Sequence, residues 1–241
     1  MPVVLSVRTR LDELSERYAL PAGAAERLER LLDLVAAEPS AITSVRDPAR
    51  GVDVHVADSL VALDRDEIRA ARRIADLGAG AGFPGLALAV ALPQTSVALV
   101  ESAGRKCAFL EAAGRALGLE NIEVVNARAE AWHDGLETQD AVTARALAPL
   151  PVLLEYAAPL LRRDGALVAW KTPIDPVEEA DAGAAAVALG MSPPVGVPVQ
   201  PFNGAGERCL YLSSKVGSTP NGYPRRPGMA RKRPLGASTG R

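Results

Sequence analysis

Residues 76–85 read DLGAGAGFPG and place four glycines within eight positions, at Gly78, Gly80, Gly82 and Gly85. A short strand-like segment, residues 73–77, leads into this loop, and a helix is expected from about residue 85 to residue 91. Glycine lets a backbone turn sharply and approach a ligand closely, and the strand–loop–helix context makes such a loop informative. The stretch therefore predicts a cofactor site in an α/β fold, with a bare turn between strand and helix as the alternative.

The spacing of the loop narrows the choice of cofactor. A dinucleotide fingerprint needs glycine where Phe83 stands, and no Lys-Ser/Thr pair follows as in a phosphate-binding P-loop. Glu101 closes the next expected strand, where an acid can accept hydrogen bonds from both ribose hydroxyls of an adenosine. An acid in the first strand, Asp76, can face the positively charged amino-acid end of S-adenosylmethionine. This favours S-adenosylmethionine over NAD.

Strands and helices alternate beyond residue 72. Apolar periodicity predicts helices within 6–37 and 40–72, and then the following succession. Expected strands are 73–77, 96–101, 121–126, 141–144 and 165–171; expected helices are 85–91, 103–117, 151–161 and 176–189; and 195–199 with 209–213 form a closing antiparallel hairpin. The pattern predicts a doubly wound, Rossmann-like α/β fold with helices on both sheet faces. We expect an N-terminal helical cap (1–70), a cofactor-binding domain (71–214) and a basic, disordered tail (215–241).

The charge is distributed unevenly along the 241 residues. The net charge is −2, but 7 of the 27 Lys and Arg residues lie in residues 215–241, which contain no acid. The rest of the chain therefore has 20 basic residues against 29 acidic ones. An acidic body with a basic tail is typical of a protein that binds a polyanion, and the alternative is a tail that only improves solubility.

Other features exclude several classes of protein. The two cysteines, Cys107 and Cys209, are too few for a disulfide framework, and no His/Cys/Asp cluster has the spacing of metal ligands. The longest apolar run, residues 86–92, is far shorter than the ~20 residues of a membrane span. We expect a soluble, cytoplasmic protein with neither metal nor membrane partner. His55 and His133, the only histidines, are expected to be structural and solvated, respectively.

Seven segments in a fixed order resemble the RsmG family, ribosomal RNA small subunit methyltransferase G, also called glucose-inhibited division protein B. They are TSVRDP (43–48), HVADSL (55–60), DLGAGAGFPGLAL (76–88), ESAGRKCAFL (101–110), NIEVVNARAEAW (121–132), TARALAPL (143–150) and the strand ending in Lys171. The tail YPRRPGMARKRPL (223–235) is also like that of many members. The resemblance covers most of the chain.

The resemblance implies a class I S-adenosylmethionine-dependent methyltransferase fold, and an enzyme that methylates N7 of a guanosine in 16S rRNA. Its partner would be 16S rRNA or the small ribosomal subunit. Carried over by motif, Gly78 and Phe83 would contact the cofactor, Ala129 and Glu130 would lie against its adenine, and Arg145 would lie beside it. Gly80 and Glu101 complete the expected cofactor-binding set.

Methylation of guanine N7 requires few catalytic groups from the protein. N7 bears a lone pair and no proton, so the transfer needs no general base, and the protein has to align the reactants. Arg145 and Lys171 are the candidates for positioning, with no certain catalytic residue. The expected RNA-binding residues are Arg105, Lys106, Arg128, Lys171, Arg225, Arg226, Arg231, Lys232 and Arg233. Ion pairs with Glu101, Glu130 or Asp140 are the alternative for the cations at strand ends.

Other functions remain open at this point. A related enzyme would methylate another RNA or a small molecule, although the basic tail speaks against a small molecule. Phe83 and the absence of an evident proton donor disfavour a nicotinamide-dependent oxidoreductase. A non-catalytic RNA-binding protein of the same fold would predict erosion of the glycine loop or of Glu101, and both are intact. We expect a monomer.

Overall fold

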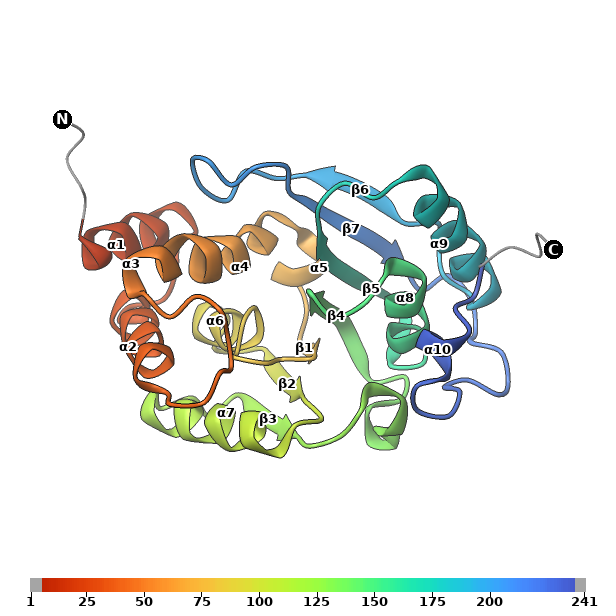
Figure 1. Cartoon of the computed structure of the whole chain (residues 1–241), viewed down its shortest axis with the longest axis horizontal. Helices are drawn as coiled ribbons and strands as arrows, with labels where there is room; N and C mark the ends of the chain where they lie inside the picture. The colour runs from red at the N-terminus through yellow and green to blue at the C-terminus, as the bar shows by residue number, and fades with distance from the viewer. Residues whose placement is uncertain (1–5, 237–241) are drawn as a thin grey trace.

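The computed structural model describes residues 6–236, and a seven-stranded sheet runs through its centre (Figure 1). The strand order is β3-β2-β1-β4-β5-β7-β6, with only β7 antiparallel to its two neighbours. The strands are β1 (Arg73–Leu77), β2 (Ser96–Val100), β3 (Ile122–Val125), β4 (Gln139–Arg145), β5 (Leu161–Lys171), β6 (Val195–Pro198) and β7 (Cys209–Ser214). The expected doubly wound sheet and its closing hairpin are confirmed.

Helices cover both faces of this sheet. They are α1 (Val7–Arg17), α2 (Ala24–Ala37), α3 (Pro48–Gly51), α4 (Asp58–Leu60), α5 (Asp66–Arg69), α6 (Gly85–Ala91), α7 (Gly104–Ala116), α8 (Leu150–Ala157), α9 (Pro176–Ala188) and α10 (Met229–Lys232). A π-helical segment, Val52–Ala57, joins α3 to α4, and short 3-10 turns occupy Val61–Asp64, Ala129–Ala131 and His133–Gly135. Across the part of the chain described, no helix has the length and apolar character to cross a membrane.

The sheet separates two hydrophobic cores, and its strands alternate between them. In β2, Val97 and Leu99 belong to the core beneath α1 to α7, whereas Ala98 and Val100 belong to the core beneath α8 to α10. Successive side chains of a strand point to opposite faces, so a strand covered on both sides is apolar throughout. This is why the central strands read as continuous apolar runs in the sequence.

The N-terminal helices share a core with the sheet. Leu11 of α1 and Leu28 of α2 are fully buried in the same cluster as Leu86 and Leu88 of α6. The cap therefore packs on the sheet through α6, on one side of the molecule (Figure 1). The division of the chain into parts at residues 70 and 214 stays a prediction.

The topology reverses between β1 and β4. The chain runs from β1 outward through β2 to β3, and then returns to β4 on the other side of β1 before continuing to β5. Ligands of doubly wound sheets bind beyond the carboxyl ends of the strands at such a switch point. The loops that follow β1, β2, β3, β4 and β5 are thus brought to one edge.

The C-terminal segment corrects the expectation of a disordered tail. Residues 215–236 pack on the body, and Lys215 is buried with its Nζ donating to the Ala158 carbonyl at 2.7 Å. Burial lowers the pKa of Lys215 to about 8. Ala230 of α10 lies in the core beneath α8 and α9. The basic, proline-rich composition suggested disorder, but such a segment can pack when its few apolar and charged groups find partners in the body. Arg241, the last of the seven basic residues, lies outside the described residues.

Candidate active site

The glycine loop is shaped by close contacts on both sides. Gly78 has φ of +69°, and a Cβ there would lie 2.8 Å from Leu147 Cδ1. A Cβ on Gly85, the first residue of α6, would lie 2.3 Å from Leu99 Cδ2 and 2.6 Å from an oxygen of Asp76. Glycine at position 78 lets the loop lie against Leu147, and glycine at position 85 lets α6 pack closely on the sheet.

Asp76 supports the loop and does not face a ligand, which corrects the interpretation made from the sequence. Its carboxylate accepts hydrogen bonds from Gly85 N and Thr143 Oγ1, both at 2.9 Å, and the residue is 1% exposed. Burial raises the pKa of Asp76 to about 7. Because the acid is held inside the fold, its presence before the loop does not discriminate between cofactors.

Glu101 holds the expected ribose position at the end of β2. One carboxylate oxygen accepts from Gly80 N at 3.2 Å and the other accepts from Ala103 N at 2.8 Å. Each oxygen retains a lone pair, and the side chain lines a cavity. The carboxylate is therefore already oriented for two further donors, as the paired hydroxyls of a ribose would be.

A cavity of about 380 Å³ opens at the carboxyl ends of β1, β2, β3 and β4. Its size lies within the range of small-molecule sites. The cavity contains five of the seven residues expected to bind the cofactor: Gly78, Glu101, Ala129, Glu130 and Arg145. Gly80 contributes through its hydrogen bond to Glu101. Phe83 lines neither this cavity nor the one beside it; its buried ring stacks on His55 with the centroids 4.7 Å apart.

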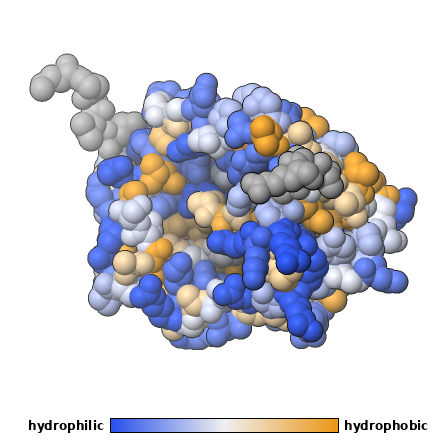
Figure 2. Space-filling model, turned by 45° about the vertical axis from the view of Figure 1, so that its right-hand side comes forward, coloured by the Kyte–Doolittle hydropathy of each residue, from blue (hydrophilic) through white to orange (hydrophobic). Residues whose placement is uncertain are grey.

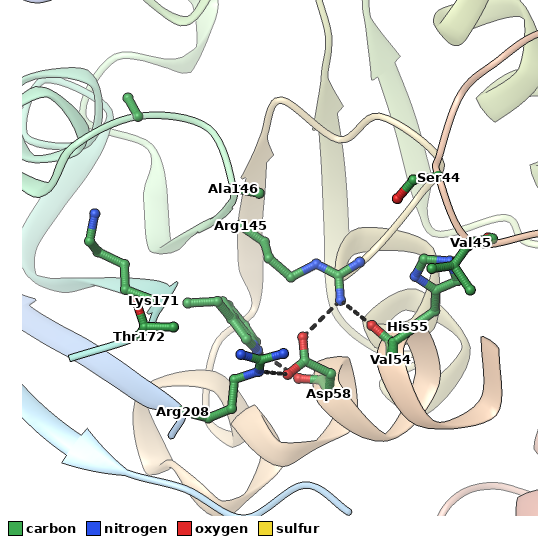
Figure 3. A pocket seen from close by; sticks show the side chains of 12 residues that line it. Ser44, Val45, Val54, His55, Asp58, Arg145, Ala146, Lys171, Thr172 and Arg208 are labelled. Atoms are coloured by element: carbon green, nitrogen blue, oxygen red, sulfur yellow. Dashed lines mark hydrogen bonds and ion pairs between the residues drawn. The ribbon is translucent and has the colours of Figure 1, made fainter. Parts of the chain in front are cut away.

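A second cavity, of about 540 Å³, shares Arg145 and Ala146 with the first. Figure 3 shows the Arg145 guanidinium and the Asp58 carboxylate pointing toward each other across it. Arg145 Nη1 donates to Asp58 Oδ2 at 2.9 Å and to the Val54 carbonyl at 3.0 Å. Asp58 is 6% exposed, so this ion pair is largely shielded from water and fixes the arginine in place.

Two further cations line the second cavity. Lys171 at the end of β5 pairs with Glu178 at 2.7 Å, and Arg208 lies 3.6 Å from Asp58 Oδ1. Glu178 reaches Lys171 because Asp175 caps α9, accepting hydrogen bonds from the backbone of Val177 and Glu178. With Arg145, three cations line the cavity, and the carboxylates of Asp58 and Glu178 pair with them, so one net positive charge is left for an anionic ligand.

His55 and Asp58 are the histidine and the carboxylate that line the second cavity within residues 6–236. Burial lowers the pKa of His55, whose Nε2 lies 2.9 Å from the Val45 carbonyl and serves as its donor. Asp58 is engaged by arginines. In the same range, no group of His, Cys, Asp and Glu side chains could hold a metal ion. The cations of the cavity can bind and align an acceptor group.

The cations expected to bind RNA fall into different surroundings. Lys106 and Arg128 line the first cavity, as does Arg231. Arg225 donates from Nε to Glu155 Oε1 at 2.6 Å, and Glu155 is 1% exposed, so this arginine is engaged inside the protein. Arg105, Arg226, Lys232 and Arg233 line neither cavity and are exposed, and Arg128 and Arg231 are exposed at the rim of the first cavity.

Sequence reasoning missed Asp58, Arg208 and the anchoring of Trp170. The indole Nε1 of Trp170 donates to the Asp58 carbonyl at 2.6 Å, tying β5 to the cap. Asp58 was present in the HVADSL segment, but an acid in a helix gives no sign of its partner. Arg208 precedes β7 outside every quoted motif, so no signal marked it.

The comparison with family models gives a match over residues 25–192 to the family described as rRNA small subunit methyltransferase G. The chain belongs to the rRNA small subunit methyltransferase G family. A relative from Rubrobacter xylanophilus with this name is 40% identical over 200 residues, covering 80% of this chain and 77% of the relative. One from Symbiobacterium thermophilum is 37% identical over 223 residues, covering 88% and 91%.

Comparison with solved structures shows that the fold of this chain is similar to that of known methyltransferases. An S-adenosylmethionine-dependent methyltransferase, SibL, in its apo form is similar with a TM-score of 0.57 at 15% identity, covering 90% of this chain and 71% of that protein. An S-adenosylmethionine-dependent O-methyltransferase from Thermotoga maritima is similar with a TM-score of 0.51 at 17% identity, covering 76% and 73%. This chain thus has the Rossmann-like methyltransferase fold that the sequence predicted.

Proposed function

We propose that this protein transfers a methyl group from S-adenosylmethionine to N7 of a guanosine in 16S rRNA. The observation that carries the proposal is the pair of cavities that meet at Arg145. One has the glycine loop and the oriented Glu101 carboxylate, and the other has three cations. Family membership names small-subunit rRNA as the substrate class of the relatives.

The first cavity is suited to S-adenosylmethionine. Glu101 offers free lone pairs to the ribose, the Gly78 backbone forms part of the wall, and Ala129 with Glu130 forms the opposite side. When bound, S-adenosylmethionine would supply an electrophilic methyl group to the N7 lone pair, and the electron pair of the C–S bond would return to sulfur. Arg145, at the junction of the cavities, would then orient the acceptor.

The second cavity is suited to a guanine with its flanking phosphates. Arginine and lysine donate to the O6 edge of guanine and to phosphate oxygens. Lys171 and Arg208 offer such donors beside Arg145. Asp58 keeps Arg145 in one orientation. A base of structured RNA would leave its stack to enter.

The exposed cations would bind the rRNA backbone. The face turned forward in Figure 2 carries a compact group of strongly hydrophilic residues on the side of α10. We propose Arg226, Lys232 and Arg233 for phosphate contacts, with Arg105 at the start of α7. An rRNA substrate would place the protein in the cytoplasm; the expected monomer stays a prediction.

Replacing Arg226, Lys232 and Arg233 together by glutamine should weaken rRNA binding and flatten its salt dependence. Each phosphate contact that is lost reduces the slope of log K against log salt by about 0.7 to 0.9, so we expect a change of about 2 to 3 units. The measurement is a binding titration at several salt concentrations. The control replaces Arg30, Arg115 and Arg163, which are exposed elsewhere, and an equal change there would contradict a specific role for the C-terminal cations.

The experiment that tests the proposed function is mass mapping of 16S rRNA from cells with and without this gene. The proposal predicts that one guanosine loses a methyl group when the gene is deleted and regains it on complementation. An unchanged guanosine profile would contradict the function. Methylation of a different nucleotide would keep the enzyme class and replace the acceptor.

A further inference from the structure

Residues 219–236, here called the C-terminal strap, are fastened to the body at several independent points. Gly228 N donates to Glu130 Oε1 at 2.8 Å, and Arg231 Nη2 donates to the Leu147 carbonyl at 2.6 Å. Arg225 is ion-paired with the buried Glu155. The attachments reach the turn after β3, the loop after β4 and helix α8. The strap thus ties together three separate elements of the fold.

Those attachments coincide with the wall of the first cavity. Glu130, Leu147 and Arg231 all line it, together with Tyr156 of α8. Leu147 is also the residue that a Cβ at Gly78 would strike. The strap therefore contributes Arg231 to the cavity and holds two of the residues that shape it.

Arg231 retains the chemistry of a ligand-binding residue. Its guanidinium has five N–H donors, and the contact with the Leu147 carbonyl uses only Nη2. The planar guanidinium can stack on an aromatic ring and can donate to ring nitrogens. Glu101 sets the ribose position in the same cavity. Arg231 lines this cavity together with Glu130 and Tyr156, so the part of the ligand that it would contact is the adenosine.

We propose that the C-terminal strap is part of the cofactor site and that Arg231 binds the adenosine portion of the cofactor. This inference rests on the proposed function, because it takes the first cavity to be the S-adenosylmethionine site. It removes Arg231 from the rRNA-binding set and leaves that role to Arg226, Lys232 and Arg233, which line neither cavity. It also makes cofactor binding and strap placement interdependent, since each stabilises the other.

Calorimetric titration with S-adenosylhomocysteine tests the proposal. Arg231→Ala should raise the Kd for S-adenosylhomocysteine about tenfold, which is the typical contribution of one contact between a guanidinium and an aromatic ring. Arg231→Lys should also bind more weakly than wild type, because lysine keeps the charge but not the planar fork. Arg163→Ala, which removes an exposed arginine at the opposite end of β5, should leave Kd unchanged. Adenosine alone should lose affinity by the same factor as S-adenosylhomocysteine in each Arg231 variant.

Limited trypsin digestion gives a second readout that does not depend on activity. S-adenosylhomocysteine should slow cleavage after Arg225 and Lys232 in the wild type, and protect the Arg231→Ala protein much less at equal ligand concentration. Thermal unfolding without ligand verifies that the variants are folded. If the wild type binds S-adenosylhomocysteine and Arg231→Ala binds equally well, the strap assignment is wrong while the proposed function stands. If the wild type does not bind, the proposed function fails as well.

Discussion

Replacing Glu101 by alanine should raise the Kd for S-adenosylmethionine by about a hundredfold, which corresponds to about 3 kcal/mol. The carboxylate does two things that alanine cannot do. It orients the glycine loop through Gly80 N and the entry to α7 through Ala103 N, and it presents its remaining lone pairs to the cavity. Losing both the preorganised loop and the ribose acceptor explains the size of the effect.

Calorimetry with S-adenosylmethionine measures this loss directly, and NAD serves as a ligand that should not bind. Glu123→Ala is the matched control, because Glu123 is an exposed glutamate on the neighbouring strand β3. Glu101→Gln should lose less than the alanine variant, since an amide oxygen can still accept one of the backbone hydrogen bonds. Unchanged affinity in Glu101→Ala would place the cofactor elsewhere.

Replacing Arg145 by alanine should reduce the rate of methyl transfer at least a hundredfold and also destabilise the protein. The carboxylate of Asp58 would be left largely buried without its closest partner, and breaking a buried pair on one side typically costs about 3 to 5 kcal/mol. The loss of activity has a different origin, because Arg145 lies where the two cavities meet. Stability and activity can therefore be separated.

The double variant Arg145→Ala/Asp58→Ala separates the two effects. It should recover part of the stability lost in Arg145→Ala, because no unpaired carboxylate remains, and Arg208 would lose only its longer 3.6 Å contact. Methyl transfer should stay as low as in the single variant. Chemical denaturation and single-turnover transfer measure the two quantities. Recovery of activity together with stability would show that Arg145 acts only by supporting the fold.

The fold was predictable because local patterns determine it. Continuous apolar strands separated by amphipathic helices lead to one sheet topology, and α6 begins and ends where the sequence places it, at Gly85 and Ala91. The cofactor cavity was predictable for a related reason. Its residues follow strand ends, and parallel strands bring their carboxyl ends to one edge.

The partners of individual side chains were not predictable. Arg145 and Asp58 are 87 positions apart, and Trp170 contacts the Asp58 carbonyl from 112 positions away. Such contacts depend on how the cap sits on the sheet, which periodicity does not encode. The C-terminal cations show the same limit: Arg225 and Arg226 are adjacent and chemically alike, yet Arg225 is paired with buried Glu155 and Arg226 is exposed.

Methyl transfer by the purified protein tests the proposed rRNA methylation directly. The protein is incubated with S-adenosylmethionine carrying a labelled methyl group and with unmodified 16S rRNA, either free or in small subunits, and the product is digested to nucleosides and mapped. We expect label in N7-methylguanosine at a single position of the rRNA, with Arg145→Ala giving almost none. Label in another nucleoside, or no label in rRNA from a protein that binds S-adenosylmethionine, would contradict it.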